Sequence, residues 1–206
     1  MSDLPVLDHW VGGAAWPGTS TRTAPVYDPA RGEAQREVRL AGADDVAAAV
    51  ASATAAAPAW RDASLAKRQG VMFAFREILN ARKEELARIL TSEHGKVLAD
   101  AHGEIARGLE VVEFACAAPH LLKGEYSESV STGVDVYTLR QPLGVVGVIS
   151  PFNFPAMVPL WFVPIALAAG NAVVLKPSEK DPSAANWIAE RYAEAGLPAG
   201  VLSVVH

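Results

Sequence analysis

Several features that often identify a function are scarce in this sequence. Its 206 residues contain one cysteine, Cys116, which excludes an internal disulfide framework. The chain does not open with a basic region followed by an apolar core, so we expect a cytoplasmic protein without a leader peptide. A net charge of −5 gives no electrostatic reason to expect nucleic acid or an anionic membrane as a partner.

Patterns for metal binding and for membrane insertion are weak as well. The five histidines show no pair at a spacing of four and no acidic or cysteine ligand at a metal-binding spacing, so we expect no metal site. Residues 154–175 approach the ~20 apolar residues that cross a bilayer. Pro155, Pro159 and Pro164 interrupt that stretch, and basic residues are missing on its N-terminal side. We expect no membrane span, and a kink in any helix that contains Pro164.

Three short apolar runs predict the core of the fold. Residues 145–149 and 172–175 are rich in β-branched side chains and too short for helices, which predicts two strands buried on both faces. A segment of helical length separates them, and a third run at 201–205 follows a mixed segment at 181–196. The alternation predicts parallel strands joined by right-handed crossovers, which is half of a doubly wound nucleotide-binding sheet.

Polar residues gather just past the ends of the first two predicted strands. They are Ser150, Asn153, Lys176, Ser178 and Glu179. Open parallel sheets bind ligands at this edge. The phosphate-binding loop Gly-x-Gly-x-x-Gly is absent, which argues against the usual mode of dinucleotide binding. Glu179 nevertheless stands where such folds hold an acid to the ribose hydroxyls, and its carboxylate would repel a 2′-phosphate.

The N-terminal part of the chain predicts a scaffold. Residues 1–39 are rich in glycine and proline and predict a strand or two along the edge of a larger body. Residues 126–140 have strand composition with a turn at 132–133. Four helices are predicted from caps, glycines and prolines, namely Asp44 or Asp45 through Ala57 before Pro58, Ser64 through Leu79, residues 83–94 before Gly95, and residues 97–118 before Pro119.

Two residues of the fourth predicted helix are candidates for chemistry. Cys116 shares an apolar stripe with Ile105 and has no nearby cation to lower its thiol pKa, so we predict a packing residue rather than a nucleophile. Arg107 lies off that stripe, three residues from both Glu104 and Glu110. A solvated ion pair explains Arg107 as well as a role in ligand binding does.

Two motifs at the right separation resemble a known family. The sequences PFNFP at 151–155 and AGNAVVLKPSE at 169–179 are similar to the first half of the cofactor domain of the NAD(P)-dependent aldehyde dehydrogenases. The resemblance extends over nearly the whole chain, through segments at 11–13, 27–33, 59–60 and 93–96. Residues 107–116 and 151–164 most resemble the methylmalonate-semialdehyde dehydrogenases, which are CoA-acylating.

The resemblance implies an α/β fold of the aldehyde dehydrogenase type. Residues 1–123 would form the helical N-terminal layer of the cofactor-binding domain, and residues 124–141 a bridging β arm that pairs with another subunit. Residues 142–206 would form the first half of a Rossmann-type parallel sheet. A homodimer or homotetramer is therefore expected of the full-length protein.

The resemblance also implies a reaction. An NAD-dependent enzyme of this type would oxidise methylmalonate or malonate semialdehyde through a cysteine thioester and release the acyl group to CoA. Asn153 would donate its side-chain N–H to the developing oxyanion, although a turn between strand and helix favours the same residue type. Arg107 would bind the free carboxylate of the substrate through its guanidinium.

Cofactor contacts implied by the resemblance fall on five residues. Ser150 and Phe152 would contact the nicotinamide side of NAD through their backbone. Lys176 and Glu179 would hold the adenosine ribose, and Lys180 would lie near the adenine. As a lysine in an exposed turn, Lys180 could equally be inert.

The catalytic cysteine of the family follows the cofactor domain, whereas the one thiol here precedes Asn153. We therefore expect an N-terminal fragment that is inactive alone and binds NAD weakly at most. Two other interpretations stay open, a noncatalytic nucleotide-binding module and a structural oligomerisation piece. The first requires Lys176 and Glu179 but not Asn153, and the second requires none of them.

Overall fold

The chain folds around one central sheet. The computed structural model describes residues 4–206. Its strands are β1 (Val6–Leu7), β2 (His9–Val11), β3 (Ala14–Trp16), β4 (Thr23–Asp28), β5 (Glu33–Arg39), β6 (Tyr126–Ser131), β7 (Val134–Tyr137), β8 (Val145–Ile149), β9 (Ala172–Lys176) and β10 (Leu202–Val204). Its helices are α1 (Ala43–Arg61), α2 (Leu65–Ala81), α3 (Lys83–His94), α4 (Leu98–Cys116), α5 (Ala118–Leu121), α6 (Met157–Ala168) and α7 (Ser183–Glu194).

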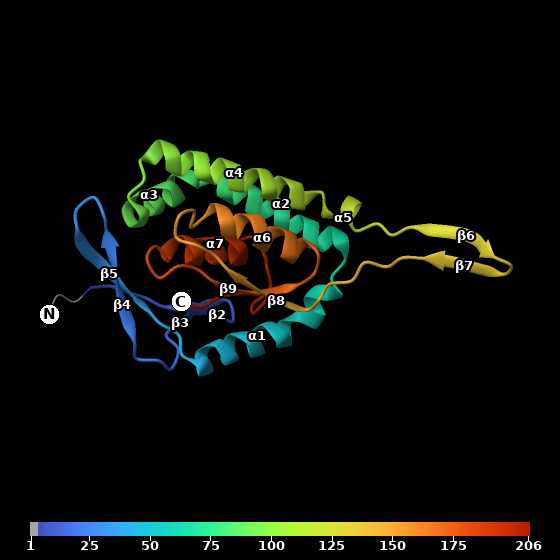
Figure 1. Ribbon diagram of the computed structural model, residues 1–206, viewed down its shortest axis with the longest axis horizontal. Helices are drawn as coiled ribbons and strands as arrows, with labels where there is room; N and C mark the ends of the chain where they lie inside the picture. The colour runs from blue at the N-terminus through green and yellow to red at the C-terminus, as the bar shows by residue number, and fades with distance from the viewer. Residues whose placement is uncertain (1–3) are drawn as a thin grey trace.

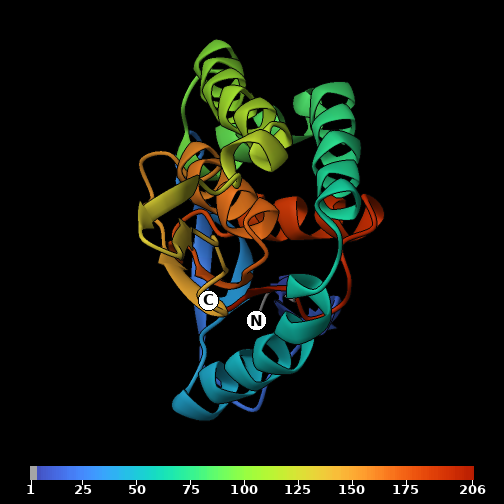
Figure 2. The ribbon, with the colours of Figure 1, turned by 90° about the vertical axis from the view of Figure 1, so that its right-hand side faces the viewer.

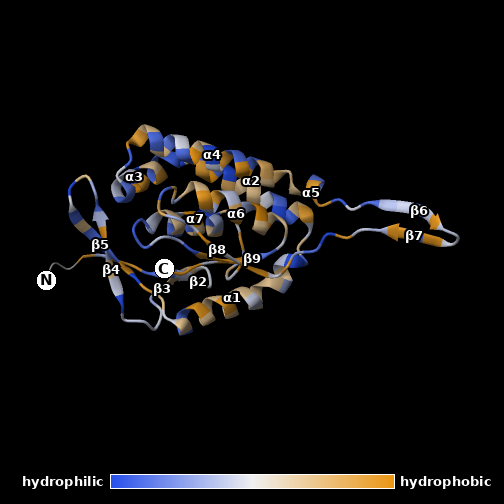
Figure 3. Ribbon diagram, in the orientation of Figure 1, coloured by the Kyte–Doolittle hydropathy of each residue, from blue (hydrophilic) through white to orange (hydrophobic). Residues whose placement is uncertain are grey.

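The elements form four layers, which Figures 1 and 2 show from two directions. Helix α1 covers one face of the five-stranded sheet, and α6 and α7 cover the other. Helices α2, α3 and α4 lie over α6 and α7 as an outer layer. Figure 3 shows that α6 is apolar on nearly all sides, as expected of a helix placed between a sheet and a second helical layer.

The predicted order of strand, helix, strand, helix and strand is confirmed. Strand β9 pairs in parallel with β8 on one side and with β10 on the other. The connections are α6 and α7, so the unit is half of a doubly wound sheet. Val173 and Leu175 of β9 are buried in the core between α1 and α6.

Strand β8 differs from the prediction. Residues 145–149 were expected to be buried on both faces, but Ile149 is 83% exposed and the other residues of β8 are half-buried or exposed. The strand order β3-β2-β10-β9-β8 places β8 at the edge of the sheet within residues 4–206. An apolar run predicts a strand from its own composition, whereas burial also depends on whether another strand lies beside it.

The N-terminal region contains more strands than the strand or two expected. The hairpin of β2 and β3 extends the central sheet, because β2 pairs antiparallel with β10. Strands β1, β5 and β4 form a separate three-stranded sheet, and β4 contacts α3. The N-terminal region therefore adds two strands to one edge of the central sheet and also covers the end of α3.

Pro58 was wrongly predicted to end a helix. Helix α1 continues past Pro58 to Arg61. Pro58 and Thr54, four residues earlier, are exposed, so the carbonyl group that loses its helical partner can be hydrated. Trp60 drives the last turn into the core, where its Nε1 donates to the backbone oxygen of Leu167 at 3.0 Å.

The other helix ends largely match the prediction. Ser64 caps α2 by accepting a hydrogen bond from the Lys67 amide at 3.2 Å. Helix α3 ends at His94, with Gly95 in the left-handed conformation at φ 85°. Helix α4 ends at Cys116 rather than at residue 118, and Pro119 lies in the first turn of the short helix α5, where proline is tolerated.

The predicted hairpin at residues 126–140 is confirmed as β6 and β7, which pair antiparallel and project away from the layered body (Figure 1). Every residue of both strands is exposed. Its role as an oligomerisation arm stays a prediction, and so does the division of the chain into domains. Within the described part of the chain, α6 and the other helices are too short or too polar to cross a membrane.

Asp45 joins the start of α1 to the loop that follows β3. The N-cap of α1 is Gly42, so the predicted capping role of Asp44 or Asp45 belongs to Asp45 acting from inside the first turn. The buried Asp45 carboxylate accepts hydrogen bonds from the amides of Gly42 at 2.8 Å and Thr19 at 2.6 Å and from the Thr19 hydroxyl at 2.8 Å. These bonds lower the pKa of Asp45 to about 2.

We predict that Asp45→Asn lowers the free energy of unfolding by about 1–3 kcal/mol at pH 7, because an amide cannot accept at both positions. The folded-state pKa of Asp45, about 2, lies below the ordinary value of 3.8, so its contribution is complete above pH 4 and lost toward pH 2. Urea unfolding between pH 7 and pH 2 measures this loss. Asp44→Asn is the control, since Asp44 is exposed in the same turn, and equal losses in both variants would contradict the assignment.

Candidate functional site

The candidate site lies where β8 and β9 end. The amide of Ser150 donates to the backbone oxygen of Lys176 at 3.0 Å, so the strand pairing continues one residue past β8. This bond places the junction from β8 to α6 beside the junction from β9 to α7. Most of the side chains expected to contact ligands are carried by these two junctions. The Ser150 side chain is buried, and its hydroxyl has no hydrogen-bond partner within residues 4–206.

Lys176 and Glu179 form an ion pair at the end of β9. Their side chains are about half exposed, with the Lys176 Nζ 3.2 Å from the Glu179 carboxylate. A hydrogen bond from its own backbone amide, followed by the one from Lys176, lowers the pKa of Glu179. Glu179 is therefore ionised at neutral pH, and both groups remain accessible to a ligand with hydroxyl groups.

Phe152 and Lys180 lie on a cavity of about 480 Å³. The Lys180 Nζ is 4.5 Å from the centre of the Phe152 ring, which is the geometry of a cation–π contact. Glu179 lines the same cavity. The structure thus brings three of the five predicted cofactor residues to one cavity, while Ser150 and Lys176 lie outside its lining.

Sequence reasoning missed two buried acids on this cavity. Burial, together with the charges of Glu93 and Glu104, raises the pKa of Asp181 to about 7. Glu93 accepts hydrogen bonds from the amide and the hydroxyl of Ser183 at 3.0 and 2.5 Å, and lies 3.5 Å from the Arg36 guanidinium. Among residues 4–206, no group of three or more potential ligand side chains is arranged to hold a metal ion.

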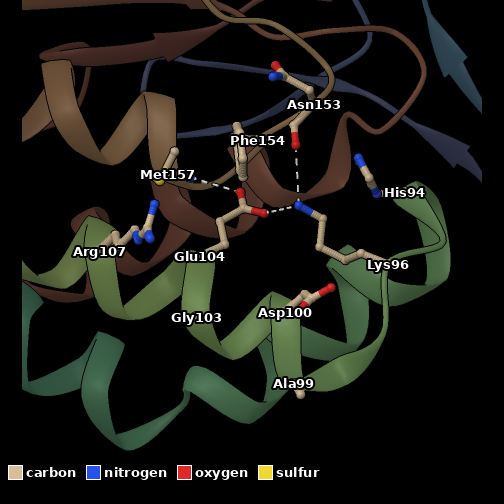
Figure 4. A pocket seen from close by; sticks show the side chains of 10 residues that line it. All are labelled: His94, Lys96, Ala99, Asp100, Gly103, Glu104, Arg107, Asn153, Phe154 and Met157. Carbon is tan, nitrogen blue, oxygen red and sulfur yellow. Dashed lines mark hydrogen bonds and ion pairs between the residues drawn. The ribbon is translucent and has the colours of Figure 1, made fainter.

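The buried carboxylate of Glu104 fixes the start of α6. Its Oε1 accepts hydrogen bonds from the amide of Ala156 at 2.8 Å and from that of Met157 at 3.0 Å, the second of which is drawn in Figure 4. The first amides of a helix lack partners within the helix, and a carboxylate there also complements the helix dipole. Glu104 therefore attaches α4 to the junction from β8 to α6.

Lys96 completes this attachment from the loop between α3 and α4. Its Nζ pairs with the other oxygen of Glu104 and donates to the backbone oxygen of Asn153 at 3.3 Å. The same ammonium lies 4.9 Å from the centre of the Phe154 ring. We refer to Lys96 and Glu104 as the junction pair, because together they hold residues 153–157.

Asn153 and Arg107 line one cavity of about 440 Å³ beside the junction pair (Figure 4). The Asn153 amide points away from Lys96 and Glu104, so the backbone of Asn153 is bound while its side chain stays available. The alternative of an ion pair between Arg107 and Glu104 is wrong, because Glu104 is buried and bound to Lys96. Within the described residues Arg107 makes no ion pair, and it is exposed.

The predicted packing role of Cys116 is confirmed. Its side chain is buried in the core at the end of α4, and burial raises its thiol pKa. A thiol that is both buried and hard to ionise is a poor nucleophile. Cys116 also lies outside the linings of both cavities described above.

Comparison with known proteins identifies the family of this chain. The sequence pattern of the aldehyde dehydrogenase family matches residues 16–206. The chain belongs to the aldehyde dehydrogenase family. Malonate-semialdehyde dehydrogenase of Pseudomonas aeruginosa is 51% identical over 185 residues, which cover 90% of this chain and 37% of that protein. The acylating mitochondrial methylmalonate-semialdehyde dehydrogenase of Arabidopsis thaliana is 47% identical, covering 98% of this chain and 33% of that protein.

Solved structures show the same fold. A putative methylmalonate-semialdehyde dehydrogenase of Sinorhizobium meliloti, complexed with NAD, superposes with a TM-score of 0.97 at 48% identity. That match covers all of this chain and 42% of the other. This aldehyde dehydrogenase chain therefore spans well under half the length of the relatives it matches.

The junction pair could have been detected in the sequence of this aldehyde dehydrogenase. Glu104 lies on the face of α4 that also buries Ala101, Ile105 and Gly108. A glutamate on an apolar face is unusual, and when buried it needs a partner. The sequence suggested Arg107 as the partner of Glu104 because it is only three residues away, whereas Lys96 lies eight residues away across a turn.

We predict that Lys96→Met destabilises the protein by about 3–5 kcal/mol, because it leaves the Glu104 carboxylate buried without its partner. Glu104→Gln keeps an acceptor for the start of α6, so adding it to Lys96→Met should restore part of the loss. Denaturant unfolding of the single and double variants measures the coupling. Lys83→Met, at an exposed lysine of α3, is the control, and strictly additive losses would contradict the pairing.

Proposed function

We propose that the protein takes part in NAD-dependent oxidation of malonate or methylmalonate semialdehyde. The observation that carries this proposal is the cavity shared by Asn153 and Arg107, which combines a hydrogen-bond donor with a guanidinium. An aldehyde that also bears a carboxylate needs both groups at its binding site. The names of the relatives from Pseudomonas aeruginosa and Arabidopsis thaliana support the same substrate class.

Asn153 would stabilise the negative charge that develops on the aldehyde oxygen. A donor works best in this role when its position is fixed before the reaction, and loss of one such donor costs about 2.7–4 kcal/mol of barrier. The junction pair holds the Asn153 backbone oxygen and the start of α6. The hydrogen bonds that fix the loop involve the backbone of Asn153, so its side-chain amide remains free to donate to the substrate.

The guanidinium of Arg107 would bind the carboxylate of the semialdehyde. It is exposed on α4 and lines the cavity that Asn153 also lines. Arginine suits this task, because its planar fork matches the two oxygens of a carboxylate. Glu104 does not compete for Arg107, since its carboxylate is bound to Lys96 and to the start of α6.

NAD would supply the hydride acceptor. The chain offers Lys176 and Glu179 for the adenosine ribose, and their half-exposed, ionised side chains fit hydroxyl groups. Lys180 and Phe152 lie on the adjoining cavity, and the backbone near Ser150 and Phe152 would face the nicotinamide side. The structure from Sinorhizobium meliloti, which is complexed with NAD, supports this cofactor.

The acyl acceptor is proposed to be CoA. Support comes from the Arabidopsis thaliana relative, which is named as acylating. The reaction requires a nucleophilic thiol to form the thioester. Cys116 does not provide it, because its side chain is buried and its pKa is raised.

In the intact protein, malonate or methylmalonate semialdehyde with NAD should yield NADH and, when CoA is present, the acyl-CoA. We predict that NADP is used at least about tenfold less efficiently, since about 1.4 kcal/mol of repulsion from Glu179 is enough for that ratio. Spectroscopic NADH formation and product analysis measure both results. Glu179→Gln should bring kcat/KM with NADP closer to kcat/KM with NAD.

Controls separate the parts of this proposal. Cys116→Ser should leave turnover of the intact protein unchanged, and the 206-residue chain alone should give none. Turnover that Cys116→Ser abolishes would contradict the proposed absence of a nucleophile in this chain. Equal use of NAD and NADP would contradict only the assignment of Glu179 to the adenosine ribose and would leave the rest of the proposal standing.

We predict that Arg107→Leu raises KM for malonate semialdehyde about ten- to hundredfold, which is the effect of losing a charged hydrogen-bond partner worth about 1.5–3 kcal/mol. An aliphatic aldehyde without a carboxylate should be little affected. Steady-state kinetics with both substrates tests this. Arg88→Leu, at an exposed arginine of α3, is the control, and parallel effects of Arg107→Leu on both aldehydes would remove Arg107 from the substrate site.

A further inference from the structure

A third cavity, of about 330 Å³, lies where the β6–β7 hairpin leaves the body. Its walls come from the end of α1, the start of α2, the end of α5, the segment before β8 and the end of α6. Gln141 and Pro142 of this lining precede β8, whereas Asn153 follows it. The cavity is therefore at the opposite end of β8 from the candidate active site.

The lining is strongly basic. It includes Arg61, Arg68 and Arg140 against one acid, Asp62. The Asp62 carboxylate already accepts two hydrogen bonds from Arg61, at 2.8 and 3.4 Å. Arg140 donates through Nε to the backbone oxygen of Lys123 at 3.3 Å, and its side chain is exposed at the cavity. Arg68 and Arg140 therefore have no acidic partner among the residues that line the cavity.

Arg68 is the central feature of this cavity. It is only 7% exposed, and its Nε and Nη1 atoms find no acceptor in residues 4–206. Burial lowers its pKa, and no neighbouring carboxylate offsets this effect in the described part of the chain. Buried guanidinium groups are normally paired, because an unpaired buried charge is costly. Arg68 therefore has hydrogen-bonding capacity that the described residues leave unused.

The position of Arg68 is fixed by its surroundings. It lies one turn into α2, where its amide donates to the backbone oxygen of Ser64 at 3.1 Å. Leu65, the first residue of α2, also lines the cavity, so the positive end of the helix dipole opens toward it. Gly170 lies against the Arg68 guanidinium, and a Cβ at position 170 would collide with the Arg68 Nη1.

We propose that this cavity binds a small oxyanion, a molecule carrying a phosphate or a carboxylate group. The planar guanidinium of Arg68 would bind it from inside, because its fork matches two oxygens of such a group. The exposed side chains of Arg140 and Arg61 would contact it from the mouth. The helix dipole of α2 adds to the same preference for negative charge. Binding here is independent of Asn153, Arg107 and the proposed reaction.

A different explanation is that Arg68 is stabilised by the negative end of α6, whose last turn lies beside it at Ala169 and Gly170. A carboxylate of another protein segment could also occupy the cavity. Under both alternatives Arg68 is already stabilised and the cavity does not take up a free anion from solution, so a direct binding measurement distinguishes them from the proposal.

The probe is inorganic phosphate, titrated calorimetrically into the protein against sodium chloride at matched ionic strength. We expect saturable binding with a dissociation constant of about 1 mM or tighter. Arg68→Met should weaken binding about tenfold or more, since it removes the charged donor. Without phosphate, Arg68→Met should be at least as stable as the parent, because an unpaired buried charge is replaced by an apolar side chain of similar length.

Arg140→Gln provides a second variant that does not disturb the core. It should weaken phosphate binding while leaving stability without phosphate unchanged, because its side chain is exposed. Arg31→Gln, at an exposed arginine between β4 and β5, is the matched control and should bind as the parent does. Malonate in place of phosphate determines which oxyanion is preferred. Absence of saturable binding of both anions, or unchanged binding by Arg68→Met, would overturn the proposal.

Discussion

The buried pairing of Lys96 with Glu104 is the constraint on which the rest of the site depends. A carboxylate whose side chain is 1% exposed must be fully bonded, and Glu104 is satisfied by Lys96 and by the first amides of α6. The outer helices α3 and α4 are thereby attached to the end of β8. This helical layer, which its sequence presents as scaffold, holds the loop that carries Asn153 in place.

The two cavities beside the junction pair differ in electrostatic character. One presents Arg107 and Asn153, and the other contains the buried acids Glu93 and Asp181 under the cation Lys180. His94 lines both cavities, so they meet at the end of α3. The first cavity therefore presents a guanidinium and a side-chain amide, while the second can respond to protonation of a carboxyl group near neutral pH. The proposed function uses this division, with the substrate carboxylate in the first cavity and hydroxyl groups of the cofactor at the second.

Local patterns predicted the elements of this fold well, because their signals lie within a few residues of one another. The glycine after α3, the serine before α2 and the turn of the β6–β7 hairpin were all placed correctly. Two predictions that depend on neighbours in space failed. Pro58 does not end α1, because Trp60 two residues later is drawn into the core against α6. The apolar run of β8 is not buried on both faces, because its burial depends on which strand lies beside it.

The sequence by itself determined the order β8, α6, β9, α7, β10, the family resemblance and the residues that follow β8 and β9. The elements follow from side-chain periodicity and from turn residues, which act over short distances along the chain, whereas the resemblance rests on the motifs at 151–155 and 169–179. Only the tertiary structure decided that Glu104 binds Lys96 rather than Arg107, and that Arg107 faces the cavity of Asn153. It also decided that Arg68 is buried, since burial and charge pairing depend on which segments meet in space.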